Sequence, residues 1–175
     1  KLIDVHRIHL LLGKFGGKTI FDSLNEIISE DMLSHEHIEE FHEATYSTQS
    51  NDKYTNQVKR TLNYFISYDH REKVLDELMS CFFPEEDLLV KEFYMTRDEI
   101  LQLSRAGMII GSHGVNHSVM SKLAMSEQKK EIESSFEFLE SISGNLEYKT
   151  FCYPYGGFHS FSDETERYLD EYGCL

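Results

Sequence analysis

The apolar residues of this chain follow one spacing up to about residue 92 and another after it, and this change constrains the fold most. In residues 1–92 they recur every three or four positions, which is the period of an amphipathic helix. The helical stripes are Val5, Ile8, Leu11 and Leu12; Leu24, Ile27 and Ile28; Val58, Leu62, Phe65 and Ile66; and Val74, Leu75, Leu78, Met79 and Phe82. The spacing predicts that residues 1–92 form a helical region, either an insertion or a subdomain, with a loop over residues 45–56.

After residue 92, helical stretches alternate with short apolar runs. Thr96 and Glu99 match the capping box of a helix start, and glycines stand where helices would stop. The pattern predicts helices over residues 96–106, from Ser126 to Gly144 and over 162–172, and short buried parallel strands over 108–110 and 149–153. Alternation of this kind is typical of an α/β layer with parallel strands. We therefore expect residues 93–175 to belong to the α/β class.

Composition narrows the classes of partner. The chain has 31 acidic residues against 17 Lys and Arg, so its formal charge is −14. Nucleic acids and anionic membranes attract basic faces, so this balance argues against both, while a neutral glycan stays compatible. No apolar run approaches the roughly 20 residues of a membrane span. The three cysteines include no CxxC pair and do not predict a disulfide framework, which favours a reducing, cytoplasmic setting.

Two histidines, His113 and His117, follow the first predicted strand in the string Gly-Ser-His-Gly-Val-Asn-His. Sites in α/β proteins gather where strands end, and two imidazoles four residues apart can bind one metal ion if the backbone makes a turn. Spacing alone is weak support in a chain with nine histidines, so unrelated surface side chains remain an alternative. We expect the other helical histidines to be solvated or partly buried, namely His6, His9, His35, His37 and His42.

The second predicted strand is followed by Pro154-Tyr155-Gly156-Gly157. Proline followed by glycines makes a rigid turn that can present a backbone N–H to a ligand. Such a donor is the kind of group that stabilises an oxyanion. A plain structural turn is the alternative interpretation.

Taken together, the strings GMIIGSHGVNHSVMSKLAMSEQKKEIESSFEFL and TFCYPYGGFHSFSDETERYLDEYG resemble the polysaccharide deacetylases (NodB-homology domains, carbohydrate esterase family four). The resemblance covers residues 94–175. It implies a distorted (β/α) barrel, of which residues 93–175 would form a part. It also implies a divalent metal, commonly zinc, and hydrolytic removal of an acyl group, usually N-acetyl, from a sugar or polysaccharide precursor.

The resemblance also implies roles for individual residues. The metal-binding histidines of the family map onto His113 and His117, which would share the ion with an Asp. The family's Pro-Tyr-Gly motif maps onto Pro154, Tyr155 and Gly156, which would contact the substrate, with the Tyr155 backbone N–H holding the oxyanion.

The chain departs from the family pattern at several points. The Thr-Phe-Asp-Asp motif that brings the base and the metal-binding Asp is not in the sequence, and neither are the later motifs with the acid His. Cys152 stands where many members have Arg, and Gly114 where Ser or Thr is common. We expect an internal portion of a longer protein. The alternatives are a noncatalytic carbohydrate-binding relative, a deformylase or other amidohydrolase on the same fold, or a helical interaction module in residues 1–92. Nothing in the sequence predicts the oligomeric state.

Overall fold

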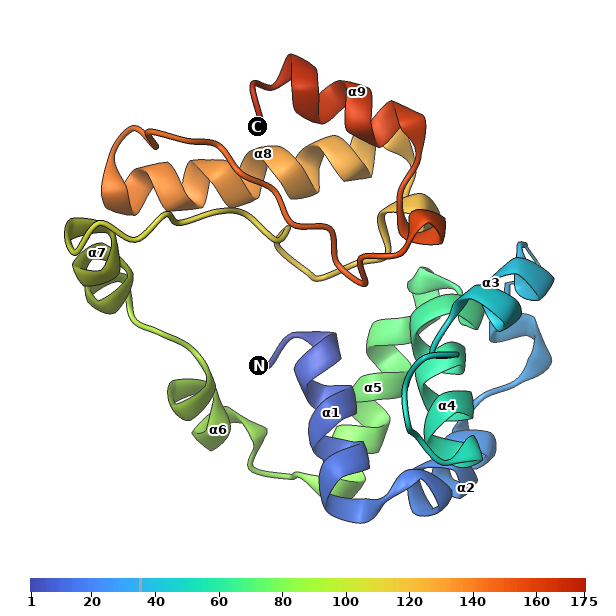
Figure 1. Ribbon diagram of the computed structural model, residues 1–175. Coiled ribbons are helices and arrows are strands. Elements are labelled where there is room, and N and C mark those ends of the chain that lie inside the picture. The colour runs from blue at the N-terminus through green and yellow to red at the C-terminus, as the bar shows by residue number, and fades with distance from the viewer. Residues whose placement is uncertain (35) are drawn as a thin grey trace. The chain divides into compact units, whose positions relative to one another are not determined.

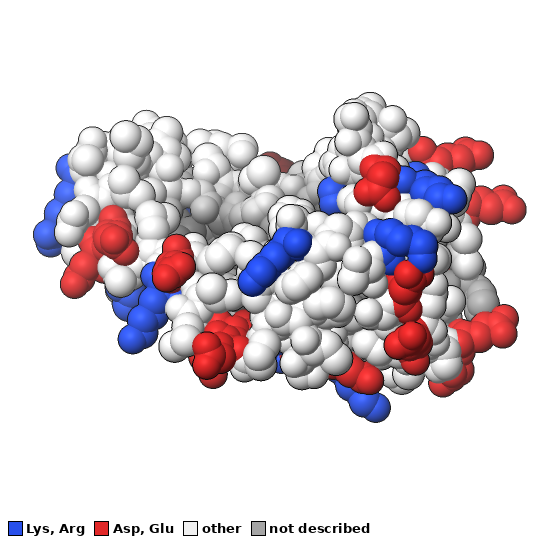
Figure 2. All heavy atoms as spheres, turned by 90° about the horizontal axis from the view of Figure 1, so that it is seen from below, with Lys and Arg blue, Asp and Glu red and all other residues white. Residues whose placement is uncertain are grey.

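The computed structural model describes residues 1–34 and 36–175, so His35 lies outside the described residues. The chain separates into a first unit, Lys1–Glu92, and a second unit, Phe93–Leu175, and both are built mainly of helices (Figure 1). Within the described ranges, no helix combines the length and the hydropathy that a bilayer crossing requires. On the face that Figure 2 shows, acidic and basic side chains are mixed, and the described atoms in this view form no continuous basic area.

The first unit is helical, as the spacing of its apolar residues predicts. Its core is formed by side chains that belong to the predicted stripes, among them Leu11, Leu62 and Leu75, which are fully buried. Its elements are α1 (Asp4–Phe15), α2 (Gly17–Ile27), η1 (Glu30–Met32), α3 (Ile38–Ala44), α4 (Lys53–Arg60), the π-helical turn η2 (Thr61–Phe65), α5 (Tyr68–Phe82) and α6 (Glu86–Phe93).

A buried ion cluster connects three helices of the first unit. Arg7 on α1 is only 2% exposed. Its Nε and Nη2 donate hydrogen bonds to the Glu86 carboxylate at 2.8 and 2.7 Å, and its Nη1 lies 2.8 Å from Asp76 Oδ1. Burial by itself would lower the pKa of Arg7, but these two carboxylates raise it above its ordinary value. The cluster therefore ties α1 to α5 and to the start of α6.

The second unit packs two helices and several extended segments around α8. Its core contains Met120, Ile132, Phe136 and Leu169, and α8 contributes two of these side chains. The predicted capping box at the start of α7 is formed, because Glu99 Oε2 accepts a hydrogen bond from the Thr96 backbone N–H at 2.7 Å. The elements are α7 (Arg97–Arg105), η3 (Met120–Lys122), α8 (Met125–Ser143), η4 (Phe158–Ser160) and α9 (Asp163–Glu171).

The expectation of an α/β fold, as a portion of a (β/α) barrel, is wrong for the described residues, which form no sheet. Their only β-type pairings are two isolated bridges, and one of these joins Ser112 and Phe151 in parallel. The reason lies in burial, because parallel strands are stable when both faces are covered. Met108 and Ile109 instead remain 59% and 68% exposed. A single pair of adjacent segments is marginal in water, so the apolar runs stay extended without becoming strands.

Candidate active site

The segment that precedes His113 lies against residues 150–152. The Ser112 backbone N–H donates to the Thr150 carbonyl at 2.8 Å, and the Cys152 N–H donates to the Ser112 carbonyl at 2.9 Å. Gly111 makes this close approach possible, since a Cβ atom there would lie 2.2 Å from Thr150 Oγ1 and 2.9 Å from the Thr150 carbonyl oxygen. The pairing places His113 beside the turn that begins after Tyr153.

The hydrogen bond of His113 defines which of its nitrogens can bind a ligand. His113 Nδ1 lies 2.7 Å from the Cys152 carbonyl oxygen. A carbonyl only accepts hydrogen bonds, so in the neutral imidazole Nδ1 carries the proton and Nε2 keeps its lone pair. Metal-binding histidines are commonly oriented by such a bond from the second ring nitrogen. Cys152 thus contributes through its backbone, while its own side chain is exposed.

The second predicted histidine and the predicted turn lie next to His113. The ring centroid of His117 is 4.7 Å from that of His113 and 4.9 Å from that of Tyr155, and both pairs are close to perpendicular. His117 and Tyr155 have positive φ angles of 53° and 70°. For residues other than glycine, this conformation costs roughly 1–2 kcal/mol, and such positions cluster at functional sites. The structure therefore brings together His113, His117 and Tyr155.

The three residues of the predicted substrate turn differ in accessibility. Pro154 is buried, Tyr155 is half-buried and Gly156 is exposed with a φ of 64°. Two successive left-handed residues turn the chain sharply after Pro154. Within this turn, only Tyr155 and Gly156 offer accessible surface to a ligand.

Glu131 on α8 belongs to the site, although the sequence did not indicate it. Its side chain is only 8% exposed. Oε2 accepts hydrogen bonds from the backbone N–H groups of Val115 and Asn116 at 2.8 and 2.9 Å, and Oε1 accepts one from the Asn116 side chain. The one available signal was its place beside Ile132 on the inner face of the predicted helix. The carboxylate holds the two residues at the centre of the loop between the histidines.

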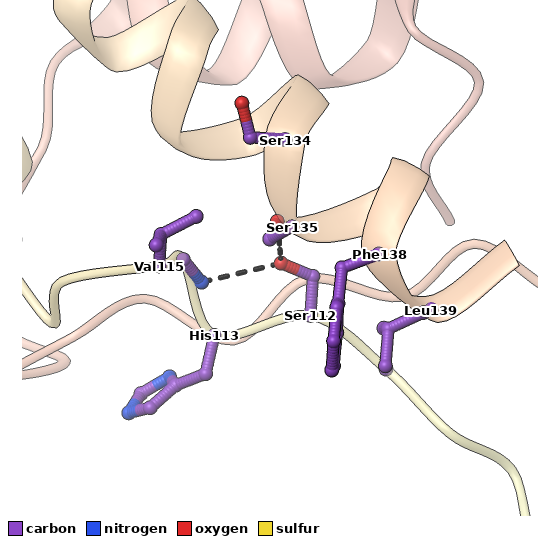
Figure 3. A pocket seen from close by; sticks show the side chains of 9 residues that line it. Ser112, His113, Val115, Ser134, Ser135, Phe138 and Leu139 are labelled. Carbon is purple, nitrogen blue, oxygen red and sulfur yellow. Dashed lines mark hydrogen bonds between the residues drawn. The ribbon is translucent and has the colours of Figure 1, made fainter. Parts of the chain in front are cut away.

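A serine pair holds the start of the same loop to α8. Ser135 Oγ donates to the Ile132 carbonyl at 2.7 Å, so the Ser112 hydroxyl, 2.5 Å away, donates to Ser135. Ser112 Oγ also accepts the Gly114 backbone N–H at 3.2 Å. Figure 3 shows the Ser112 side chain directed toward α8 and the His113 imidazole directed away from it. The loop therefore has one side bound to the helix and an opposite side that carries the imidazole.

A cavity of about 550 Å³ lies between this loop and α8 (Figure 3). Apolar side chains and serine hydroxyls share its wall, which is formed by Gly111, Ser112, His113, Gly114, Val115, Ser134, Ser135, Phe138 and Leu139. His113 contributes to this wall, but its imidazole ring points to the other side of the loop, away from α8.

The imidazoles of His113 and His117 are suitable ligands for a divalent metal ion, but they supply only two of the ligands that such an ion needs. Two imidazole nitrogens are ligands that zinc and related ions bind readily. Among the residues that the structure describes, no group of three or more His, Cys, Asp and Glu is arranged to hold a metal ion. The remaining coordination positions would need donors other than these.

Comparison with known proteins assigns the chain to a family. A family model described as polysaccharide deacetylase matches residues 73–174, which is more than half of the chain. The chain belongs to the polysaccharide deacetylase family. Membership supports a hydrolase that acts on carbohydrate. The match begins within α5, so it includes part of the first unit as well as the histidine loop and the Pro-Tyr-Gly turn. No curated protein and no solved structure matches the chain.

Gly114→Ala is expected to destabilise the second unit by about 1–2 kcal/mol, because the residue has a φ of +75° and its new Cβ would lie 3.1 Å from Glu131 Oε2. Gly144→Ala is the matched control, since Gly144 has a φ of +78° with no atom within 4 Å. Urea unfolding, followed through backbone amide signals of residues 93–175, would compare the two variants. Equal losses would show that contact with Glu131 adds nothing to the strain.

Proposed function

We propose that this protein is a metal-dependent hydrolase that removes an acyl group, usually N-acetyl, from a sugar or a polysaccharide precursor. The observation that carries the proposal is the convergence of His113, His117 and Tyr155 from two separate segments, within the region that the family model matches. Overall, water adds across the acyl carbonyl and the bond to the sugar nitrogen breaks. The amine then takes up a proton, and the acid is released.

The residues of the loop would bind the metal. His113 would use Nε2, because its Nδ1 is held by the Cys152 carbonyl, and His117 would supply the second nitrogen. A bound divalent metal, with zinc as the expected ion, polarises a carbonyl and lowers the pKa of a water molecule toward neutrality. The hydrogen bond to Cys152 keeps the His113 ring in the tautomer and the orientation that binding needs.

The turn after Pro154 would bind the reacting acyl group. Its conformation at Tyr155 and Gly156 orients successive peptide groups, and we assign to the Tyr155 backbone N–H the donation of a hydrogen bond to the developing oxyanion. One such donor is worth roughly 2.7–4 kcal/mol in the transition state. The Tyr155 ring packs against His117, and this contact supports the assignment of the oxyanion donor and the metal ligands to one site.

Zinc titration by calorimetry is the first test of this proposal. The wild type is expected to bind one ion, and His113→Ala should weaken the affinity tenfold or more, because one of two imidazole donors is lost. His42→Ala is the control, since His42 is an exposed histidine on α3. Equal affinity in all three proteins would contradict metal binding at His113.

Mass analysis of products is the second test. With zinc present, the wild type should convert an oligomer of N-acetylated amino sugar to the free amine and release acetate, and His113→Ala should not. Release of formate from an N-formylated sugar instead would identify a deformylase. Binding of the sugar without turnover at saturating zinc would contradict the enzymatic proposal and leave a carbohydrate-binding relative.

A further inference from the structure

The loop between the two histidines is held by the carboxylate of Glu131. Glu131 accepts the backbone N–H groups of Val115 and Asn116 and the side-chain amide of Asn116. Burying a carboxylate is unfavourable unless it is hydrogen-bonded, and bonds to an ionised acceptor are stronger than neutral ones. Three donors converge on this group, so its burial is compensated by contacts with the loop alone.

One face of α8 carries the polar side chains that bind the histidine loop and α9. Gln128, Glu131 and Ser135 are spaced by three and four residues, so they lie on the same side of the helix. Gln128 Oε1 accepts the Thr165 hydroxyl of α9 at 2.6 Å, and Ser135 bonds to Ser112. Glu131 lies between these two contacts. Glu131 and Ser135 both bind the loop from α8, and Figure 3 shows the His113 imidazole directed away from this helix.

These contacts fix the relative direction of the two imidazoles. The peptide groups of Val115 and Asn116 lie between His113 and His117 in the chain. Their orientation determines the direction in which the backbone enters His117. Asn116 is followed by His117 in the left-handed conformation, which an unrestrained chain adopts rarely. Without Glu131 the two peptide groups would lose their acceptor, and the loop would relax toward commoner conformations.

We propose that Glu131 is a positioning residue that holds the His113–His117 loop in the conformation in which the two rings meet. The geometric part of this proposal concerns the chain without metal. Its consequence for metal binding rests on the function proposed above. A residue that only stabilises the fold would act differently, since its loss would lower stability without changing the distance between the rings.

Four variants separate these roles. Glu131→Ala removes every acceptor, whereas Glu131→Gln keeps one oxygen for the backbone N–H groups. Glu137→Ala removes the same charge from an exposed position of α8, and Ile132→Val destabilises the core without touching the loop. The last substitution costs roughly 0.5–1.5 kcal/mol, which makes it a control for lost stability alone.

The first readout uses the metal-free protein. At a centroid distance of 4.7 Å, the rings of His113 and His117 should give a nuclear Overhauser effect between their protons. We expect this signal, and the protection of the Val115 and Asn116 amides from hydrogen exchange, to be lost in Glu131→Ala and largely kept in Glu131→Gln. Both should persist in Glu137→Ala and Ile132→Val. Persistence of the ring signal in folded Glu131→Ala would overturn the proposal.

The second readout is zinc affinity. Loss of a group that orients metal ligands typically weakens binding by roughly 10–100-fold, and we expect a loss in this range for Glu131→Ala and a smaller one for Glu131→Gln. If the wild type binds no zinc while the ring signal depends on Glu131, the proposed function fails and the positioning role stands. If the wild type binds zinc and both the zinc affinity and the ring signal are unchanged in Glu131→Ala, the positioning role fails and the proposed function stands.

Discussion

Gly111→Ala is expected to destabilise the second unit by about 3 kcal/mol, because overpacking at a rigid contact is among the costlier substitutions. The added Cβ would lie 2.2 Å from Thr150 Oγ1 and 2.9 Å from the Thr150 carbonyl oxygen. That oxygen accepts the Ser112 N–H, so the two segments cannot keep both the hydrogen bond and the new methyl group. Separation of the segments should also break the hydrogen bond from His113 to Cys152.

Unfolding in urea, monitored by amide signals of the second unit, would measure this loss, and the tautomer of His113 would be read from its ring nitrogen shifts. Gly107→Ala gives the cost of backbone strain without contact for comparison, because Gly107 has a φ of +84° and no atom within 4 Å, whereas Gly111 has the contact without a positive φ. The double variant Gly111→Ala/Thr150→Ala removes Oγ1 and should recover part of the stability. A loss in Gly111→Ala no larger than in Gly107→Ala would show that the segments separate at little cost.

The helices could be predicted from the sequence because their signals are local. The capping box of Thr96 and Glu99 and the left-handed glycine after α9 both act within a few residues, and both are present. The predicted boundaries of these helices and of the loop between them were less accurate. The helix expected from Ser126 begins at Met125, because Glu127 reaches back to the Ala124 N–H at 2.9 Å. The loop expected over residues 45–56 ends at Asp52, whose carboxylate caps α4.

The strands could not be predicted correctly, because a short apolar run does not determine its own neighbours. Met108–Ile110 has the composition of a buried strand, yet a strand also needs hydrogen-bonding partners and a cover on each face. In the described residues, the one bridge near this run joins Ser112, which follows it, to Phe151. The side chains of Met108 and Ile109 stay exposed. Sequence pattern thus indicated which two segments are adjacent and parallel, but not whether they become a sheet.

The candidate site was only partly visible in the sequence. The histidines and the Pro-Tyr-Gly turn carry recognisable motifs, and the structure places His113, His117 and Tyr155 in contact. Glu131 carries no motif, and a Glu on a helix is usually solvated. Its function depends on the loop that α8 packs against, which only tertiary structure reveals.

Arg7→Met is expected to destabilise the first unit by about 3 kcal/mol at pH 7, because removal of the guanidinium leaves the largely buried carboxylate of Glu86 uncompensated. Methionine has a similar length, so lost packing contributes little. Glu86 would keep the Leu2 N–H at 2.7 Å but lose both of its bonds from the guanidinium, whereas Asp76 is 51% exposed and can be solvated. Urea unfolding, followed by amide signals of residues 1–92, is the measurement. Lys18→Met is the control, since Lys18 and Asp22 form an exposed, solvent-screened pair whose loss should change the stability far less.

The pH dependence of this loss identifies its origin. Burial by itself would raise the pKa of Glu86, but the bonds from Arg7 and from the Leu2 N–H hold it below its ordinary value. Because the folded-state pKa is lower than the unfolded one, the stabilisation is complete above about pH 4.3 and disappears as the pH falls through the folded value. The difference in stability between wild type and Arg7→Met should therefore shrink as the pH falls below about 4.3 and through the folded-state pKa of Glu86. If the difference in stability is as large in acid as at pH 7, lost packing causes it. Recovery of stability in Arg7→Met/Glu86→Leu would confirm that the unpaired carboxylate causes the loss.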